Sequence, residues 1–200
     1  MLPLAVVPIR GFSGAKQRLA PVLDGPARAA LAGHLAAGVL DALAQVEVIV
    51  VTSDPEAAEL ARSRRATVVA DPGHSLDAAA AAGRTEAAQR GAASIAVVHA
   101  DLPYPADLDS VLREAGAGVT LVPDRHRDGT NVLVLPVDTP FEFAYGPGSF
   151  ARHCAEAERL GLRTRVVEDS PLAWDVDVPA DLQTPAAWGD PPWVTVRCDG

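Results

Sequence analysis

The chain has 200 residues, which suits one α/β domain because a single hydrophobic core usually serves about 100–200 residues. Its hydrophobic fraction is 48%, yet no apolar run approaches the roughly 20 residues that a membrane helix requires. The net charge of −9 argues against nucleic acid or an anionic membrane as a partner, since both bind basic surfaces. Any anionic substrate must therefore meet cations that are arranged locally.

The first ten residues, "MLPLAVVPIR", predict a β-strand rather than a signal peptide. The apolar stretch is short and lacks both a basic lead and a cleavage site, so we expect a cytoplasmic protein. Cys154 and Cys198 have neither metal-ligand spacing nor a disulfide framework, and we expect free thiols. The basic residues are 16 arginines and a single lysine, Lys16, and together with abundant Ala, Gly and Pro they indicate a GC-rich genome.

Seven apolar runs alternate with alanine-rich helical stretches, a pattern that predicts βαβ units. Several runs lack polar alternation, which is typical of strands covered on both faces. We predict an α/β fold, a single-domain Rossmann-like three-layer sandwich with a mostly parallel sheet, over residues 1–185. The Pro- and Trp-rich tail 186–200 would either pack over the sheet edge or form an oligomer contact, such as a homodimer interface. The apolar runs span residues 2–9, 46–53, 66–71, 94–101, 117–124, 131–137 and 163–169.

Polar residues gather where the predicted strands end, and ligands of such sheets bind at the carboxyl ends of strands. The first strand leads into a loop with three cations, Arg10, Lys16 and Arg18. Gly11 and Gly14 would let the backbone of this loop curl around an anion, such as the phosphates of a nucleotide. A solvated basic loop is the alternative, and the loop matches no common nucleotide-binding motif.

Three carboxylates follow predicted strands. Asp101 ends an apolar run and precedes a turn, which suits either a metal ligand or a cap of the helix near Pro105. In "WDVDVPADL", a short extended segment would point Asp175 and Asp177 to the same face, about 6–7 Å apart. A divalent cation such as Mg²⁺ would offset their repulsion, whereas two acids on an exposed edge strand is the alternative. Asp181 more simply starts or caps the following short helix.

Two further segments offer neutral donors. Thr130 and Asn131 follow a polar turn. Gly146 and Gly148 precede Ser149, which we expect to be the N-cap of a helix whose free amides could hold an anion. The histidines are scattered and form no nucleophile–base pattern, so nucleophilic catalysis is not expected.

Taken together, these segments resemble a known family. "VPIRGFSGAKQRL", "HADLP", "DRHRDGTNVL", "FAYGPGSFARH" and "WDVDVPADL" occur in the order seen in the 2-phospho-L-lactate and phosphoenolpyruvate guanylyltransferases of deazaflavin coenzyme F-420 biosynthesis. That family resembles the wider group of molybdenum-cofactor guanylyltransferase-like nucleotidyltransferases, with a nucleotide-diphospho-sugar transferase-like fold. The likeness covers about residues 6–182.

The resemblance implies an enzyme that transfers GMP from GTP, its co-substrate, to a phosphorylated three-carbon acid and releases pyrophosphate. It implies that Arg10 and Asp77 replace a lysine and an asparagine of the family, which weakens the case for a nucleotide contact by Asp77. Hand-off of the product to the next enzyme of the pathway would follow. The implied roles are Mg²⁺ ligands at Asp101, Asp175 and Asp177, acceptor contacts at Thr130, Gly146 and Ser149, and GTP contacts at Arg10, Lys16, Arg18 and Asp77.

Other functions remain open at this point. A nucleotidyltransferase acting on a molybdopterin or a sugar phosphate, and a nucleotide-sensing module without turnover, would share these features. A Rossmann oxidoreductase is disfavoured because no glycine fingerprint follows the first strand. For the acceptor we favour phosphoenolpyruvate over 2-phospho-L-lactate, since the composition indicates an actinobacterium and such family members resemble phosphoenolpyruvate users.

Overall fold

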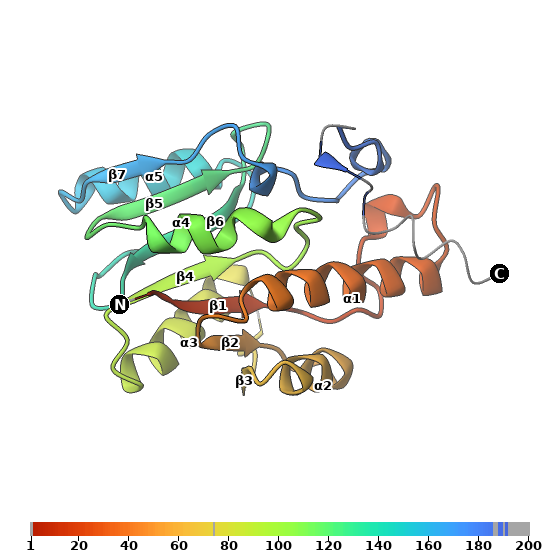
Figure 1. Cartoon of the computed structure of the whole chain (residues 1–200), viewed down its shortest axis with the longest axis horizontal. Helices are drawn as coiled ribbons and strands as arrows, with labels where there is room; N and C mark the ends of the chain where they lie inside the picture. Colours follow the sequence, from red (N-terminus) through yellow and green to blue (C-terminus); the bar gives the residue numbers. More distant parts are fainter. Residues whose placement is uncertain (1, 74, 186–187, 190, 192–200) are drawn as a thin grey trace.

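Seven strands form one sheet in the order β3-β2-β1-β4-β6-β5-β7 (Figure 1). The computed structural model describes residues 2–73, 75–185, 188–189 and 191, and each predicted apolar run overlaps one of the strands. The strands are β1 (Leu4–Pro8), β2 (Val48–Val51), β3 (Thr67–Val69), β4 (Ser94–Val98), β5 (Val119–Pro123), β6 (Thr130–Pro136) and β7 (Thr164–Val166).

The sheet is parallel except at β6, which runs antiparallel to both β4 and β5. The prediction of a mostly parallel sheet is therefore confirmed. Because β1 and β4 are parallel neighbours, their carboxyl ends lie side by side, where ligand sites of such sheets form. The segment around Asp175 differs from the expectation of a strand: its backbone is extended at Trp174 and Val178, but it joins no strand of the described sheet.

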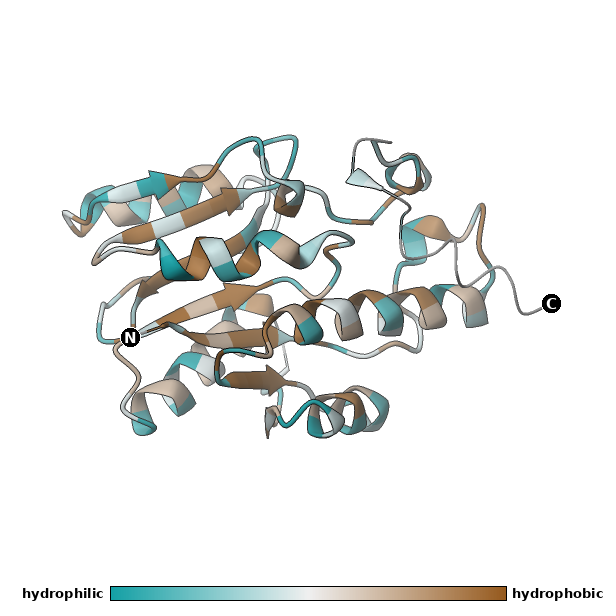
Figure 2. Ribbon diagram, viewed as in Figure 1, coloured by the Kyte–Doolittle hydropathy of each residue, from teal (hydrophilic) through white to brown (hydrophobic). Residues whose placement is uncertain are grey.

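Helices cover both faces of the sheet, which confirms the three-layer sandwich (Figure 1). One apolar cluster packs α1, α2 and α4 on one face, and a second packs α3 and α5 on the other. The strands between them carry mostly hydrophobic residues (Figure 2). The helices are α1 (Gly25–Ala42), α2 (Pro55–Ser63), α3 (Leu76–Gln89), α4 (Leu108–Arg113) and α5 (Ser149–Arg159), with the 3₁₀ helices η1 (Gln17–Leu19), η2 (Pro105–Asp107), η3 (Pro171–Ala173) and η4 (Pro179–Leu182).

Helix α3 packs unusually close to the central strand β1. A Cβ atom built on Gly83 would lie 2.2 Å from Val6 Cγ1, a distance that no pair of carbon atoms tolerates. Only glycine therefore lets α3 approach the strand at this depth. The close approach brings the first turn of α3, with Leu76, beside the carboxyl end of β1.

A third, smaller apolar cluster joins distant parts of the chain. Leu19 of η1, Leu31 and Leu35 of α1, and Val176 are buried against one another. Val176 is fully buried although it lies between two acids, so its packing anchors the segment that carries Asp175 and Asp177. The cluster therefore brings the loop after β1 and this acidic segment to the same end of α1.

None of the described helices is long and apolar enough to cross a membrane. Cys154, in α5, is a free thiol as predicted, whereas Cys198 lies outside the described residues.

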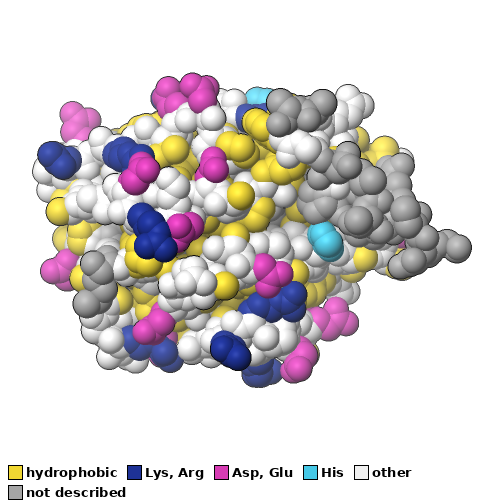
Figure 3. All heavy atoms as spheres, viewed as in Figure 1, with side chains coloured by type: hydrophobic (Ala, Val, Ile, Leu, Met, Phe, Trp, Pro, Cys, Tyr) yellow, Lys and Arg dark blue, Asp and Glu magenta, His cyan; other side chains and the backbone are white. Residues whose placement is uncertain are grey.

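Trp188 packs edge-on against Tyr104 and Trp174, at ring distances of 5.4 and 5.6 Å. Most of the tail 186–200 lies outside the described residues, so its two suggested roles stay predictions. On the face shown in Figure 3, acidic and basic side chains lie interspersed.

Candidate active site

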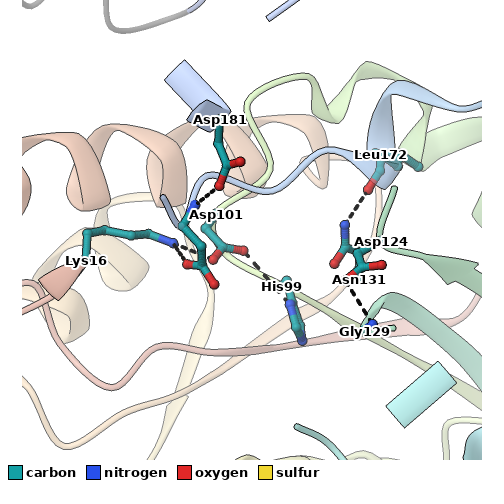
Figure 4. Close-up of polar contacts among 9 residues, drawn as sticks. Lys16, His99, Asp101, Asp124, Gly129, Asn131, Leu172 and Asp181 are labelled. Atoms are coloured by element: carbon teal, nitrogen blue, oxygen red, sulfur yellow. Dashed lines mark hydrogen bonds and ion pairs between the residues drawn. The ribbon is translucent and has the colours of Figure 1, made fainter. Parts of the chain in front are cut away.

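Lys16 joins two carboxylates that are far apart in the sequence. Its Nζ lies 2.5 Å from Asp101 Oδ2 and 3.0 Å from Asp177 Oδ1, and its side chain is only 9% exposed (Figure 4). Asp101 follows β4, whereas Asp177 follows the buried Val176. The backbone of Lys16 is left-handed, with φ 52° and ψ 42°, a conformation that few non-glycine residues adopt. The fold thus holds the single lysine between two of the three predicted metal ligands.

The ionisation of this cluster reflects burial and mutual charge. Burial alone would lower the pKa of Lys16, but the carboxylates of Asp101 and Asp177 outweigh it and raise the pKa. Burial would likewise raise the pKa of Asp101, but the Lys16 ammonium holds it below its ordinary value. Burial, followed by the charges of Asp101 and Asp177, raises the pKa of Asp175 to about 7. One ammonium group therefore faces three acids, and at Asp175 its effect is smaller than that of burial and of the other two carboxylates.

Two buried polar atoms beside this cluster have no hydrogen-bond partner. They are Asp101 Oδ1 and His99 Nε2. The His99 Nδ1 lies 4.0 Å from Asp101 Oδ1, and burial lowers the pKa of His99. The sequence analysis did not single out His99, although its place directly after β4 in "HADLP" could have identified it. Buried polar groups are normally satisfied, so unpaired atoms here indicate a place where a ligand completes the bonding.

A cavity of about 430 Å³ opens onto the cluster. Residues 8–16, the end of β1 and the loop after it, form much of its wall, and Ala32 and Ala36 of α1 and Leu76 of α3 add an apolar side. His99, Asp101 and Asp177 complete the lining. A glycine-containing loop, an apolar wall and acids in one cavity suit a nucleotide with its phosphates and a cation.

The predicted cations of the loop after β1 are placed differently from one another. Arg10 is exposed and lines the cavity, whereas Arg18 is exposed and is not among the lining residues. Gly11 and Gly14 have positive φ angles of 139° and 76°, as expected for a loop that curls around an anion. A Cβ atom on Gly11 would also lie 2.8 Å from Asp54 Oδ2, so the loop passes close to the start of α2.

The donor set suits a hard divalent cation. Asp101 offers an unpaired buried oxygen, and Asp175 and Asp177 add two more carboxylates nearby. Magnesium prefers such oxygen ligands. As the side chains of the described residues stand, however, no three acidic, histidine or cysteine side chains are grouped to hold a metal ion. Lys16 lies between two of the acids instead.

The chain matches the family described as "Guanylyl transferase CofC like" over residues 4–190. It belongs to this family. The match is slightly longer than the predicted 6–182, and membership confirms that the protein is a nucleotidyltransferase of the guanylyltransferase class.

Relatives and solved structures agree with this family. The chain is 41% identical to the phosphoenolpyruvate guanylyltransferase of Rubrobacter xylanophilus, over 91% of this chain and 92% of the relative. It is 42% identical to that of Sphaerobacter thermophilus, over 92% of both chains. A protein of Desulfovibrio desulfuricans G20 described as a nucleotide-diphospho-sugar transferase has the same fold, with a TM-score of 0.74 and 18% identity over 90% of this chain and 84% of that one.

Asp181, the third acid of "WDVDVPADL", has the structural role expected for it. Its carboxylate is 2% exposed and accepts hydrogen bonds from the backbone amides of Asp177 and Val178, at 2.6 and 2.7 Å. It also pairs with Arg125, whose guanidinium stacks 4.2 Å above the Trp174 ring. These bonds fold the backbone around Asp181 and hold Asp177 in place. By contrast, Asp101 caps no helix, and this alternative is excluded.

The residues implied as acceptor contacts lie on the other side of β4, around α5. Thr130 and Ser149 are each 1% exposed and face each other, with 3.4 Å between their hydroxyl oxygens. His153 Nδ1 lies 3.0 Å from Thr130 Oγ1. Gly146 is exposed, with a φ of 100°. These residues are brought together, but neither hydroxyl reaches the cavity beside Asp101 in this structure.

The expectation that Ser149 is the N-cap of α5 is wrong. Gly148 is the N-cap, in a left-handed conformation, and Ser149 is the first residue of the helix. The reason is that Asp128 supplies the capping oxygen from another segment: its carboxylate accepts a hydrogen bond from the Gly148 amide at 2.9 Å. Asp128 therefore already occupies part of the cradle that was predicted for a substrate anion.

Asp77 also has a structural partner. Its Oδ1 accepts a hydrogen bond from the backbone amide of Tyr145 at 2.7 Å, which ties the first turn of α3 to the loop before α5. The doubt about a nucleotide contact by Asp77 is consistent with this bond, although the neighbouring Leu76 does line the cavity.

Proposed function

We propose that this protein transfers GMP from GTP to phosphoenolpyruvate and releases pyrophosphate, in the biosynthesis of deazaflavin coenzyme F-420. The observation that carries the proposal is the convergence of Lys16, Asp101 and Asp177 in one cavity of a guanylyltransferase-family fold. The relatives named phosphoenolpyruvate guanylyltransferase, at 41% and 42% identity over nearly the whole chain, support the choice of acceptor.

The chemistry needs charge neutralisation and positioning rather than a general base. An oxygen of the acceptor phosphate is already ionised and attacks the α-phosphorus of GTP, while the bond from that phosphorus to pyrophosphate breaks. Both reactants are anions, so bringing them together is the main barrier that the protein lowers.

We assign Asp101, Asp175 and Asp177 as ligands of Mg²⁺. The bound ion would reduce repulsion between the two anionic substrates and stabilise charge on the reacting phosphate. Val176 and the Asp181 bonds hold two of these acids in place, and the turn after β4 holds the third. Lys16 and Arg10, on the loop after β1, face the same cavity and would neutralise the triphosphate and the departing pyrophosphate.

For the acceptor acid, we assign contacts to Thr130, Gly146 and Ser149. Because both hydroxyls are buried in this structure, their contact with a substrate requires a small opening between β6 and the loop before α5. Arg18, exposed at the edge of the loop after β1, would make a weaker contact with GTP than Lys16. These assignments follow from the family resemblance and are tested by substitution.

The deciding experiment incubates the protein with GTP, Mg²⁺ and one acid at a time: phosphoenolpyruvate, 2-phospho-L-lactate or 3-phosphoglycerate. Mass spectrometry of the guanylylated product identifies the acceptor, and a pyrophosphate assay measures the rate. We expect product with phosphoenolpyruvate. Product with 2-phospho-L-lactate alone would overturn the acceptor. Binding of GTP and Mg²⁺ without pyrophosphate release from any acceptor, molybdopterin and sugar phosphates included, would instead support a nucleotide-sensing module.

A further inference from the structure

We infer that Lys16 is an exchangeable counter-ion, which neutralises the acids of the active site until the divalent cation replaces it and then turns to the triphosphate of GTP. The inference rests on the proposed function, because it takes the three acids as the metal ligands. It adds a role that neither the family nor the proposed reaction assigns: Lys16 competes with the metal when the nucleotide is absent, and cooperates with it when the nucleotide is present.

The first observation is that Lys16 already has the contacts of a bound cation. Its Nζ lies within hydrogen-bond distance of carboxylate oxygens from two separate segments, at 2.5 Å from Asp101 and 3.0 Å from Asp177. The side chains of Lys16 and Asp101 are 9% and 24% exposed, so water screens this pair only weakly, whereas the Asp177 side chain is 46% exposed. A divalent ion bound to the same two carboxylates would lie next to the ammonium, and two like charges at such a distance repel strongly. The two cations are therefore alternatives.

The second observation is that the remaining acid is compensated least. Asp175 lies close enough to Asp101 and Asp177 for their charges to act on it, and the opposing effects of a backbone hydrogen bond and of the Lys16 charge are smaller. Asp101 Oδ1 is buried and has no hydrogen-bond partner among the described residues. A single ammonium group thus leaves the cluster with excess negative charge, and an ion of charge +2 suits it better. This difference in charge favours the exchange.

The third observation is that the Lys16 ammonium group can move from the acids into the cavity. Lys16 lies on the loop after β1, whose residues line one side of the cavity. Two glycines with positive φ, Gly11 and Gly14, give that loop unusual freedom. The long flexible stem of a lysine allows its charge to move while its Cα stays in place, which the planar fork of an arginine does less well. Lys16 is the only lysine of the chain, and the remaining 16 of its 17 lysine and arginine residues are arginines.

The consequence is a coupling between metal and nucleotide. Without a nucleotide, an incoming cation must displace Lys16 and leave the ammonium without an anionic partner. With the triphosphate present, Lys16 gains new partners as it leaves the acids. Each ligand should therefore raise the affinity for the other, and by linkage the two effects are equal.

The test measures Mn²⁺ binding to the full chain without nucleotide, by electron paramagnetic resonance of the free ion. We expect Lys16→Met to bind Mn²⁺ about tenfold more tightly than the wild type, the size of a typical coupling between sites. Arg62→Met is the matched control, because it removes one positive charge from an exposed arginine of α2 that lies outside the cavity; its affinity should match the wild type. Circular dichroism checks folding, and Lys16→Gln replaces Lys16→Met if the latter does not fold.

The reverse arm measures binding of α,β-methylene-GTP without metal. Asp177→Asn loosens the hold on Lys16 and should bind this analogue several-fold more tightly than wild type, whereas Asp138→Asn, a change of an exposed acid outside the cavity, should not. Unchanged or weaker Mn²⁺ binding by Lys16→Met, or an equal gain in Arg62→Met, would overturn the inference. If Asp101→Asn leaves Mn²⁺ binding intact, the metal site of the proposed function fails as well; formation of product by the wild type shows separately whether the reaction stands.

Discussion

Two polar clusters lie on either side of β4. The α5 cluster comprises Thr130, Ser149 and His153, and the cavity cluster comprises Lys16, His99, Asp101, Asp175 and Asp177. They differ in whether their buried polar atoms have hydrogen-bond partners. Around α5, both ring nitrogens of His153 have partners: the Ala144 amide donates to Nε2 at 3.1 Å, and Nδ1 lies 3.0 Å from Thr130 Oγ1. Around the cavity, Asp101 Oδ1 and His99 Nε2 have none. Leaving buried polar groups unpaired is costly, so a fold that does so retains them for a ligand.

The comparison separates polar groups that are paired without a substrate from groups that are not. The α5 cluster should contribute to folding, because the Thr130, Ser149 and His153 side chains already have partners. The cavity cluster should reduce the stability of the metal-free protein, because its carboxylates repel one another. It should support activity, because the same carboxylates can bind a cation. This contrast is the usual relation between stability and activity at catalytic sites. Four substitutions or conditions test it, from the largest expected effect to the smallest.

The largest effect is expected from Asp177→Ala. Loss of one proposed metal ligand should lower turnover by about 10² or more, the scale of lost electrostatic catalysis, without unfolding the protein. Pyrophosphate release with GTP and phosphoenolpyruvate measures it. The control is Asp138→Ala, which removes an exposed acid away from the cavity. Full activity of Asp177→Ala would remove the cavity cluster from the catalytic machinery.

Acidification should destabilise the α5 cluster next. Burial, then the charges of Arg152 and His99, lowers the pKa of His153 from 6.5 to about 4. The unfolded chain therefore binds a proton at a higher pH than the native chain does. The stability that comes from keeping His153 neutral is complete above pH 6.5 and is lost as the pH falls toward 4, by about 3 kcal/mol. Urea titrations between pH 7.5 and 4 measure this loss, and a curve that stays level over that range would contradict it.

His153→Leu should cost about 2 kcal/mol of unfolding free energy at pH 7.5, because the Ala144 amide and the Thr130 hydroxyl lose their partner. It should also remove most of the pH dependence just described. Chemical denaturation measures both quantities. His126→Leu, at an exposed histidine, is the control and should change the unfolding free energy by less than about 0.5 kcal/mol. An unchanged unfolding free energy in His153→Leu would mean that the α5 cluster does not stabilise the fold.

The smallest effect has the opposite sign. Asp175→Asn should stabilise the metal-free protein at pH 8 by about 1 kcal/mol, because it removes a half-buried charge that Asp101 and Asp177 repel. The same variant should lose most of its activity. Thermal unfolding in EDTA gives the stability change, with Asp138→Asn as the neutral reference. Destabilisation by Asp175→Asn would show that the Asp175 carboxylate stabilises the metal-free protein, as the paired groups of the α5 cluster do.

The segments that form the cavity were largely predictable. The loop after β1, the start of α3, the end of β4 and the acidic segment at Asp177 all reach the cavity, as expected of strand ends in a parallel sheet. The segment 52–54 does not, because Asp54 instead caps α2 through the Ala57 amide at 2.8 Å. A short polar segment after a strand can cap a helix or bind a ligand, and local sequence does not separate the two.

The sequence did not predict which hydrogen-bond and ion-pair partner each polar side chain would have. Asp128 caps α5 in place of Ser149, Asp77 holds the Tyr145 amide, and Lys16 pairs with acids 85 and 161 residues away. Each of these bonds joins segments that meet only after the sheet has formed. The position of His99 directly after β4 was visible in the sequence, but its unpaired Nε2 could be recognised only once its surroundings were known.

The sequence by itself determined the layers and the chemical character of the site: apolar runs of strand length must be buried, and acids at strand ends must face a common edge. Tertiary structure alone decided which acid meets which cation. A hydrophobic pattern acts over a few residues and is written in local order, whereas an ion pair depends on distances across the fold. Those distances were set here by the apolar packing of Val176 and Leu19 on α1, which brings the charged residues near them into place.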